Sequence, residues 1–318
     1  KTFSVTMAIH VHFSLLKYFI VSFAIVLSSH LAYGNHLRML FLVQPTPIVL
    51  NYHGGQLLKP QVTVNILWYG KFTPAQRAIV ADFIRSLNRN DATSPSPSVA
   101  SWWSTIGTYK GGPCTVVLGN QILDENYSIG KRGIANVHLK ALARKAGNKT
   151  SDINLVLTAA DVTVAGFCMR CGSHGWFRTR GSTSKFAYAW VGNSVTQCPG
   201  ECAWPFYKPL YGPQTPPLIA PNGDGGIDGM IINIATVLAG AVTNPFGQGY
   251  FQGTSAAPLE AASACTGIYG TGAFPGYPGN LLVDKTTKSS YNTNGINRRK
   301  YMLPALWDPK TSTCKPLL

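Results

Sequence analysis

Residues 61–86, QVTVNILWYGKFTPAQRAIVADFIRS, contain the pattern that decides the fold class. Alternation and β-branched residues predict a strand over Gln61–Tyr69. Thr73 as N-cap, Pro74 at the first helical position and Gln76 at the third predict a helix that begins soon afterwards. Its apolar residues recur at helical spacing, so one face of this helix is expected to be buried. A strand followed so closely by an amphipathic helix indicates that both kinds of element share a core.

The rest of the chain continues to mix strands with helices. Apolar runs predict strands over Thr115–Leu118, Asp152–Thr158 and Phe186–Val191. Helical spacing predicts helices over Ala100–Trp103, Asn136–Ala146 and Asp228–Ala241. The predicted class is therefore α/β, with a three-layer α+β arrangement as the alternative, in one domain whose mixed sheet is flanked by helices.

The N-terminal segment has the organisation of a secretory signal. Lys17 precedes the apolar run Tyr18–Leu27, and a small-residue cleavage pattern ends at Gly34. The run is shorter than the roughly 20 apolar residues of a membrane span. We therefore predict a cleaved signal peptide over 1–34, a variable segment over 35–50 and one domain over 51–318. The mature protein is expected to be secreted to the apoplast or cell wall and not to be held in a membrane.

The chain is strongly basic. Lys and Arg total 27 against 12 Asp and Glu, a net charge of +15, and loss of residues 1–34 removes two lysines and lowers it to +13. A basic surface attracts polyanions. The charge is scattered, with residues 298–300 the densest run, so no nucleic-acid site is predicted. The expected partner is an acidic wall polysaccharide or an extracellular protein or peptide.

Cysteines and sequons fit an oxidising compartment. The spacing of the four central cysteines would suit zinc in the cytosol, but after secretion disulfides are favoured. The sequence does not give the pairing, and the odd number leaves one thiol over, for which Cys114 is the candidate. Sequons at Asn126 and Asn148 predict glycosylation. The disulfide candidates are Cys168, Cys171, Cys198, Cys202, Cys265 and Cys314.

Seven stretches carry a resemblance that runs through nearly the whole mature chain. They are YHGGQLL (52–58), VNILWYGKFTPAQR (64–77), PSVASWW (97–103), YAWVGNSVTQCPGECAWP (188–205), YGPQTPPLIAPNGDGGIDGMIINIATVLAGAVTNPF (211–246), LVDKTTKSSYN (282–292) and KYMLPALWDP (300–309). Together they resemble the EXORDIUM-like, or phosphate-induced protein, family of plants. The resemblance implies a secreted apoplastic protein linked to brassinosteroid-dependent growth and cell expansion. It implies no known reaction, because that family has no established catalytic residues.

A shorter resemblance is to the metal-binding helix of zincin-like peptidases. Those proteins carry His-Glu-x-x-Glu-x-x-Thr-[Asp/Asn]-Pro, and TVLAGAVTNP at residues 236–245 fits the same frame. A Gly-Trp/Tyr and then Glu-x-x-Asp-x-Cys follow in those proteins; residues 249–250 and 260–265 stand at suitable spacing here, with Ser263 in place of the Asp. Residues 171–174 are similar to a cysteine-glycine-histidine stretch found upstream in the same proteins.

The residues that stand in this frame lack the chemistry of a metal site. Thr236 and Gly240 replace the two ligands, and Val237 replaces the general base; none of these can do that work. We therefore expect a degenerate zincin-like scaffold, which requires a helix over 228–241 packed beside residues 260–265. The remnant-site positions are His174, Thr236, Val237, Gly240 and Glu260.

No catalytic, cofactor-binding or metal-binding residue is predicted. The leading hypothesis is a non-catalytic extracellular regulator that acts by binding. One alternative is a zincin-like hydrolase of wall polymers or peptides, which a retained metal or two carboxylates converging in a pocket would favour. The other is a sugar- or peptide-binding module with an aromatic groove near Trp204–Tyr211, which an exposed aromatic cleft without such titratable groups would favour.

Overall fold

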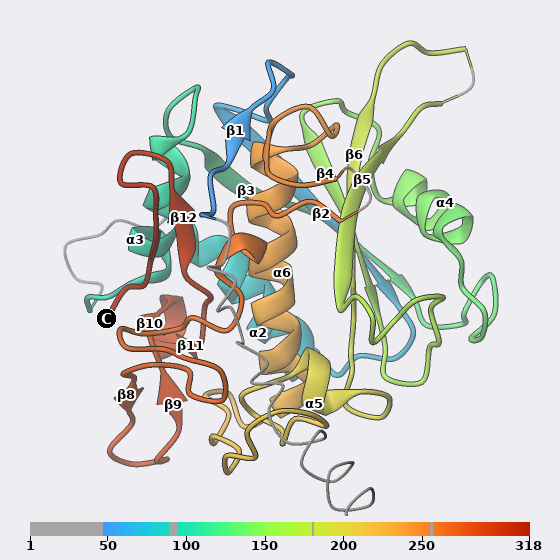
Figure 1. The fold of residues 1–318 in the computed structure, drawn as a ribbon. Helices are drawn as coiled ribbons and strands as arrows, with labels where there is room; N and C mark the ends of the chain where they lie inside the picture. Colours follow the sequence, from blue (N-terminus) through green and yellow to red (C-terminus); the bar gives the residue numbers. More distant parts are fainter. Residues whose placement is uncertain (1–46, 89–94, 180, 255–256) are drawn as a thin grey trace, which may run out of the picture. The chain divides into compact units, whose positions relative to one another are not determined.

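A five-stranded mixed sheet organises the fold (Figure 1). Its strand order is β3-β2-β4-β6-β5, and β5 at one edge is antiparallel to its neighbour while the other pairs are parallel. The strands are β2 (Gln61–Tyr69), β3 (Thr115–Asp124), β4 (Asp152–Thr158), β5 (Gly172–Phe177) and β6 (Phe186–Gly192). Every residue of β4 and β6 is buried, as expected for central strands of a sheet covered on both faces.

The computed structural model describes residues 47–88, 95–179, 181–254 and 257–318. The predicted signal peptide over 1–34 and most of the predicted variable segment over 35–50 lie outside these residues. Residues 48–318 form one compact unit. The predicted class, a single domain with a mixed sheet flanked by helices, is confirmed.

Helices cover both faces of the sheet and give three layers (Figure 1). Helix α6 packs on β5 and β6, and α2 packs on β3 and α6, whereas α4 packs on β4 and β2 from the other side. The helices are α2 (Pro74–Ser86), α3 (Val99–Trp103), α4 (Asn136–Ala146), α5 (Pro199–Cys202) and α6 (Gly225–Thr243).

Local signals placed the helices correctly. The predicted capping box of α2 is present, because Thr73 Oγ1 accepts from the Gln76 amide and the Gln76 side chain accepts from the Thr73 amide. Asp224 caps α6, since its Oδ1 accepts from the Ile227 amide at 3.0 Å. By length and composition α6 could cross a membrane, but 83% of its most apolar window is buried within this unit, so it serves as a core helix.

Strand β5, helix α5 and the short strands outside the main sheet are not among the predicted elements. Residues 172–177, for which the sequence predicts no strand, form the edge strand β5. Strand β3 also extends to Asp124, beyond the predicted end at Leu118. Eight strands of only two or three residues lie elsewhere in the described part of the chain. They are β1 (Asn51–Tyr52), β7 (Tyr250–Phe251), β8 (Leu282–Val283), β9 (Ser290–Tyr291), β10 (Thr293–Asn294), β11 (Lys300–Tyr301), β12 (Leu306–Asp308) and β13 (Thr313–Lys315).

Three disulfides brace the elements around α6. All six candidate cysteines are paired, as Cys168–Cys198, Cys171–Cys202 and Cys265–Cys314. The first two tie the segment before β5 to the region of α5, and the third ties residue 265 to β13. Cys114 is free and buried, and burial raises the pKa of its thiol to about 11.

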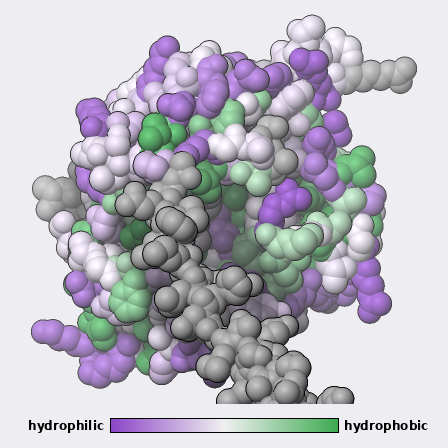
Figure 2. Space-filling model, viewed as in Figure 1, coloured by the Kyte–Doolittle hydropathy of each residue, from purple (hydrophilic) through white to green (hydrophobic). Residues whose placement is uncertain are grey.

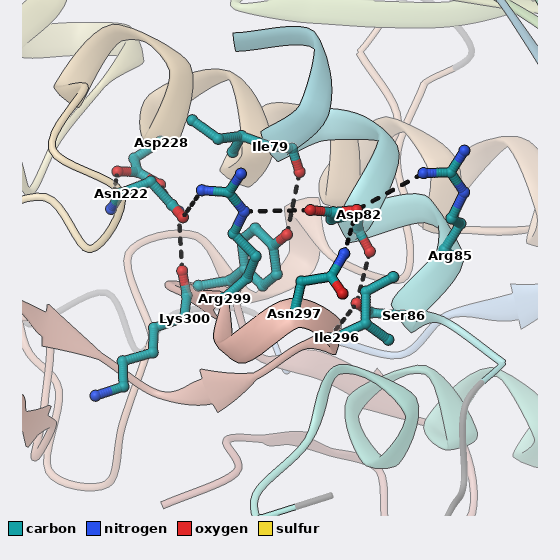
Figure 3. Close-up of polar contacts among 11 residues, drawn as sticks. Ile79, Asp82, Arg85, Ser86, Asn222, Asp228, Ile296, Asn297, Arg299 and Lys300 are labelled. Atoms are coloured by element: carbon teal, nitrogen blue, oxygen red, sulfur yellow. Dashed lines mark hydrogen bonds and ion pairs between the residues drawn. The ribbon is translucent and has the colours of Figure 1, made fainter. Parts of the chain in front are cut away.

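A buried polar network fastens the C-terminal segment to α2 (Figure 3). Asp82 is 5% exposed, and its carboxylate accepts from Asn297 Nδ2 at 3.0 Å and from Arg299 Nε at 3.2 Å. One turn later, Ser86 Oγ accepts from the Ile296 amide at 3.0 Å. These contacts join positions more than 200 residues apart in sequence.

The same network continues to the start of α6 through Asp228 (Figure 3). The Asp228 carboxylate accepts from the Asn222 amide at 2.8 Å and from Asn222 Nδ2 at 2.7 Å. Asn222 Nδ2 also donates to the Lys300 carbonyl at 2.9 Å. Burial raises the pKa of Asp228 to about 7, against the opposing effect of the Asn222 hydrogen bonds. Asp228 therefore acts in packing the helix terminus rather than in an open pocket.

Candidate functional site

His174 and Glu260 form a largely buried pair that packs against α6. His174 lies on β5, and its Nε2 is 2.7 Å from Glu260 Oε2, with the two side chains 12% and 11% exposed. Gly240 of α6 faces this pair. A Cβ at position 240 would lie 2.6 Å from Glu260 Oε2 and 2.7 Å from His174 Nε2. Glycine at this position therefore allows the pair to approach the helix, and the two side chains occupy the space that a larger residue would need.

Glu260 makes two further hydrogen bonds, one through its carboxylate and one through its main-chain amide. Glu260 Oε1 accepts from Asn244 Nδ2 at 2.7 Å, and the Glu260 amide donates to Ser263 Oγ at 2.8 Å. Asn244 is itself fixed, because its Oδ1 accepts from the Gly249 amide at 2.7 Å. Both carboxylate oxygens are thus hydrogen-bonded, as a buried acid requires.

The second ring nitrogen of His174 has no such partner. Among the residues that the structure describes, His174 Nδ1 is a buried polar atom without a hydrogen bond. With Nε2 directed to the carboxylate, Nδ1 is left to interact with a water molecule or with a ligand.

Thr236 and Val237 do not touch the pair but line a pocket one turn earlier on α6. This pocket has a volume of about 390 Å³. It is bounded by α6, by the Cys171–Cys202 disulfide, and by the rings of Trp204 and Tyr269, whose centroids are 5.7 Å apart. Figure 2, drawn from the same side as Figure 1, shows this face of the molecule hollowed, with hydrophobic side chains around the hollow. We call this cavity the α6 pocket.

The polar groups of the α6 pocket are few. Thr236 Oγ1 donates to the Ile232 carbonyl at 2.9 Å, and Asn233 Nδ2 donates to the Cys202 carbonyl at 2.8 Å, so oxygen acceptors remain for a ligand. Glu201 is the single carboxylate among the described residues that line it. The paired acids that a glycoside hydrolase uses therefore do not converge in this pocket.

The predicted aromatic groove near Trp204–Tyr211 is only partly present. Trp204 lines the α6 pocket, but Phe206 is buried, and Tyr211 is 81% exposed and lies outside the residues that form the pocket. The aromatic partner of Trp204 is instead Tyr269, which comes from a distant part of the chain and was not predicted.

A second pocket lies at the other end of β5. It has a volume of about 400 Å³ and is lined by His53, Lys185, Phe246 and Gln248 among others. Lys185 Nζ lies 4.5 Å from the ring centroid of Trp176, on β5, and 5.4 Å from that of Phe246. The α6 pocket and this Lys185 pocket thus flank the same strand.

The remaining predicted positions are accessible or untested. Asn126 and Asn148 are both exposed, in a turn after β3 and in the segment after α4, so glycans would meet no steric obstacle there. Their glycosylation stays a prediction. In the described residues, no group of three or more His, Cys, Asp or Glu side chains is placed to hold a metal ion.

Three of the five remnant-site positions come together. His174, Gly240 and Glu260 are in direct contact, and the required helix and its packing beside residues 260–265 are both present. Asn244, which completes the cluster, was not predicted, although it belongs to the Thr-Asn-Pro end of the same sequence frame. The asparagine of that frame is the sequence signal for it.

Comparison with known proteins gives matches over most of the chain. A model of the phosphate-induced protein 1 conserved region matches residues 50–317. EXORDIUM-like 2 of Arabidopsis thaliana is 59% identical, covering 87% of this chain and 92% of that protein. PHOSPHATE-INDUCED 1 of Nicotiana tabacum is 52% identical, covering 96% and 99%. EXORDIUM of Arabidopsis thaliana is 56% identical, covering 85% and 90%. No solved structure matches. The resemblance stated from the sequence is confirmed.

Proposed function

We propose that this chain, which belongs to the phosphate-induced protein 1 family of plants, is an extracellular cell-wall protein that acts by binding and not by catalysis. Its role is in growth and cell expansion, linked to brassinosteroids, as its resemblance to the EXORDIUM-like family implies. Secretion is supported by the signal-like pattern of residues 1–34 and by the three disulfides.

The contact of the His174–Glu260 pair with Gly240 carries the non-catalytic part of this proposal. A zincin-like site would need a metal ligand at position 240, but a side chain there would overlap the pair. Thr236 and Val237 supply neither a second ligand nor a base to activate water. We interpret the fold as a zincin-like scaffold in which a paired histidine and glutamate have filled the place of the metal site.

The α6 pocket supports binding as the activity. Its volume of about 390 Å³ is within the range of small-molecule and side-chain sites. Its lining joins apolar and aromatic groups to a few oxygen acceptors, with a single carboxylate at Glu201. This combination suits recognition of a ligand group more than acid–base hydrolysis, which needs two placed titratable groups.

The positive charge supports retention in the wall. With +13 after loss of residues 1–34, the protein should bind acidic pectin through long-range attraction. We expect the purified protein to be retained on polygalacturonate at low salt and to elute as salt is raised, because the Debye length falls to about 10 Å at 0.1 M. Passage through the column at low salt would remove pectin as a partner.

The decisive experiment combines metal analysis with ligand binding on the secreted, glycosylated protein. We expect no stoichiometric zinc, no hydrolysis of wall polymers or peptides, and saturable binding to a member of a wall polysaccharide and peptide panel. Thr236→Trp, which fills the α6 pocket, should abolish that binding, whereas Val137→Trp, at a 65% exposed position on α4, should leave it unchanged. Stoichiometric zinc together with hydrolysis would replace this proposal with the hydrolase hypothesis.

A further inference from the structure

Strand β5 has a second edge that no described strand occupies. It pairs with β6 on one side and lies at the end of the sheet (Figure 1). The Gly192 amide donates to the Cys171 carbonyl, so the hydrogen-bonded pairs along this ladder continue at Ser173, Gly175 and Phe177. The N–H and C=O groups of the residues between these pairs therefore point away from β6, toward the free edge.

These outward groups belong to Gly172, His174 and Trp176. All three residues are half-buried, and within the described ranges none of them makes a main-chain hydrogen bond beyond its strand. Natural edge strands are commonly protected by proline, lysine or a bulge. The β5 sequence GSHGWF has no proline and no lysine, and its pairing with β6 shows an unbroken register. The edge is therefore available as a template for another strand.

The side chains of His174 and Trp176, and the Cα hydrogens of Gly172, are on the α6 side of the sheet. Gly172 lines the α6 pocket, and His174 contacts Gly240 through its pair with Glu260. Trp176 lies beside two cations, with Lys185 Nζ 4.5 Å and the Arg178 guanidinium carbon 5.4 Å from its ring centroid. In the described part of the chain neither cation has a carboxylate partner.

We propose that an extended peptide binds this protein by adding a strand to the free edge of β5. It places an apolar side chain in the α6 pocket, beside Gly172, and an acidic side chain against Lys185 and Arg178, beside Trp176. Because residues of paired strands run in step at about 3.3 Å each, the apolar and acidic residues of the peptide are about four positions apart. This inference deepens the proposed binding function and rests on it, since it names the ligand class of the α6 pocket.

The edge favours a peptide over the other occupants. Alternating N–H and C=O groups match the main chain of an extended peptide, which supplies the complementary row. A second copy of this chain could offer its own β5, but GSHGWF contains no acidic residue to meet Lys185 and Arg178. Charge complementarity therefore selects an acidic partner segment.

The test selects peptides and then examines their main chain. Nine-residue peptides selected from a display library against the secreted full-length protein should share an apolar residue and an acidic residue about four positions apart. N-methylation at each position in turn should weaken binding at every second residue, because only alternate amides face β5. An N-methyl scan without this two-residue period would overturn the strand-addition proposal.

A matched pair of variants isolates the protein's side of the same contact. Trp176→Pro removes an outward amide without breaking a ladder bond to β6, whereas Trp176→Val removes the ring and keeps the amide. We expect Trp176→Pro to bind the selected peptide about 3- to 10-fold more weakly than Trp176→Val, the loss of one hydrogen bond. Lys185→Glu should abolish the preference for the acidic residue.

The outcomes separate this proposal from the broader one. Equal affinities of the two Trp176 variants, or a dimer of the full chain that Trp176→Pro dissociates, would overturn peptide addition at β5. If Thr236→Trp still abolished ligand binding in that case, the binding function of the α6 pocket would stand without the edge strand. If Trp176→Pro bound as tightly as Trp176→Val and Thr236→Trp also kept full binding, both proposals would be rejected.

Discussion

Replacing Gly240 with alanine tests whether the His174–Glu260 pair needs the space beside α6. An alanine Cβ would lie 2.6 Å from Glu260 Oε2 and 2.7 Å from His174 Nε2, well inside van der Waals contact. Both atoms are at side-chain ends and could move, but the Glu260 carboxylate is also held by Asn244. We therefore expect the hydrogen bond between His174 and Glu260 to lengthen or break.

The two opposing energies can be compared. Alanine is favoured over glycine in a helix interior by about 1 kcal/mol. Loss of a hydrogen bond to a charged group costs about 1.5–3 kcal/mol. Gly240→Ala should therefore lower the free energy of unfolding by about 0.5–2 kcal/mol, although the same substitution in an unobstructed helix would raise it.

Urea unfolding under non-reducing conditions, followed by tryptophan fluorescence, measures this effect with the disulfides intact. The matched background is the double variant His174→Ala, Glu260→Ala, in which the space beside position 240 is open. There Gly240→Ala should stabilise the protein by about 1 kcal/mol, the helix preference alone. Stabilisation by Gly240→Ala in the otherwise unchanged protein would refute the reasoning, because it would mean that the pair does not depend on this glycine.

Three further predictions follow from buried groups. Folded Asp228 keeps its proton up to about pH 7, whereas an unfolded carboxyl with a pKa of 3.8 loses it sooner, so stability should fall as pH rises from 4 to 7. In pH-dependent urea titrations, the unchanged protein should lose stability relative to Asp228→Asn across this range, by about 1 kcal/mol per pH unit. Cys114 is buried and its thiol pKa is raised, so it should react with a thiol reagent only as the protein unfolds. If Cys114 in the folded protein were labelled as fast as an exposed thiol, its burial would be contradicted. Replacing Cys265 and Cys314 by alanine opens a loop of sequence separation 49 and should cost about 4 kcal/mol in calorimetry or urea unfolding, against no loss if that loop is already ordered in the unfolded chain.

The parts of the fold that were predicted from sequence have local causes. Helix α2 begins where Thr73 and Gln76 can cap it, and α4 begins and ends at its predicted residues because apolar and charged positions alternate at helical spacing. Strand β5 has no such signal, since GSHGWF contains two glycines and no run of β-branched residues. Its strand state comes from pairing with β6 and from the two disulfides in the segment just before it, which are non-local contacts.

The sequence predicted only those residues of the candidate site that stand in the zincin-like pattern. His174, Gly240 and Glu260 were named because of their places in a zincin-like pattern, but His174 and Glu260 are 86 residues apart, so no periodicity predicts that they touch. The same limit applies to Trp204 and Tyr269, which meet across 65 residues to form a wall of the α6 pocket. The odd number of cysteines indicated that one thiol would be left unpaired. The connectivity of Cys168, Cys171, Cys198 and Cys202 depends instead on how β5 and α5 are brought together.

The His174–Glu260 pair links the buried helix to the free edge. The His174 side chain is fixed against Gly240, while its main-chain groups lie on the outer side of β5. A strand fixed in this way is already ordered, so a peptide that adds to it loses less conformational entropy than it would on a mobile segment. Glycine at position 240 thus lets α6 hold β5, through the His174–Glu260 pair, in the extended form that the proposed recognition of a peptide requires.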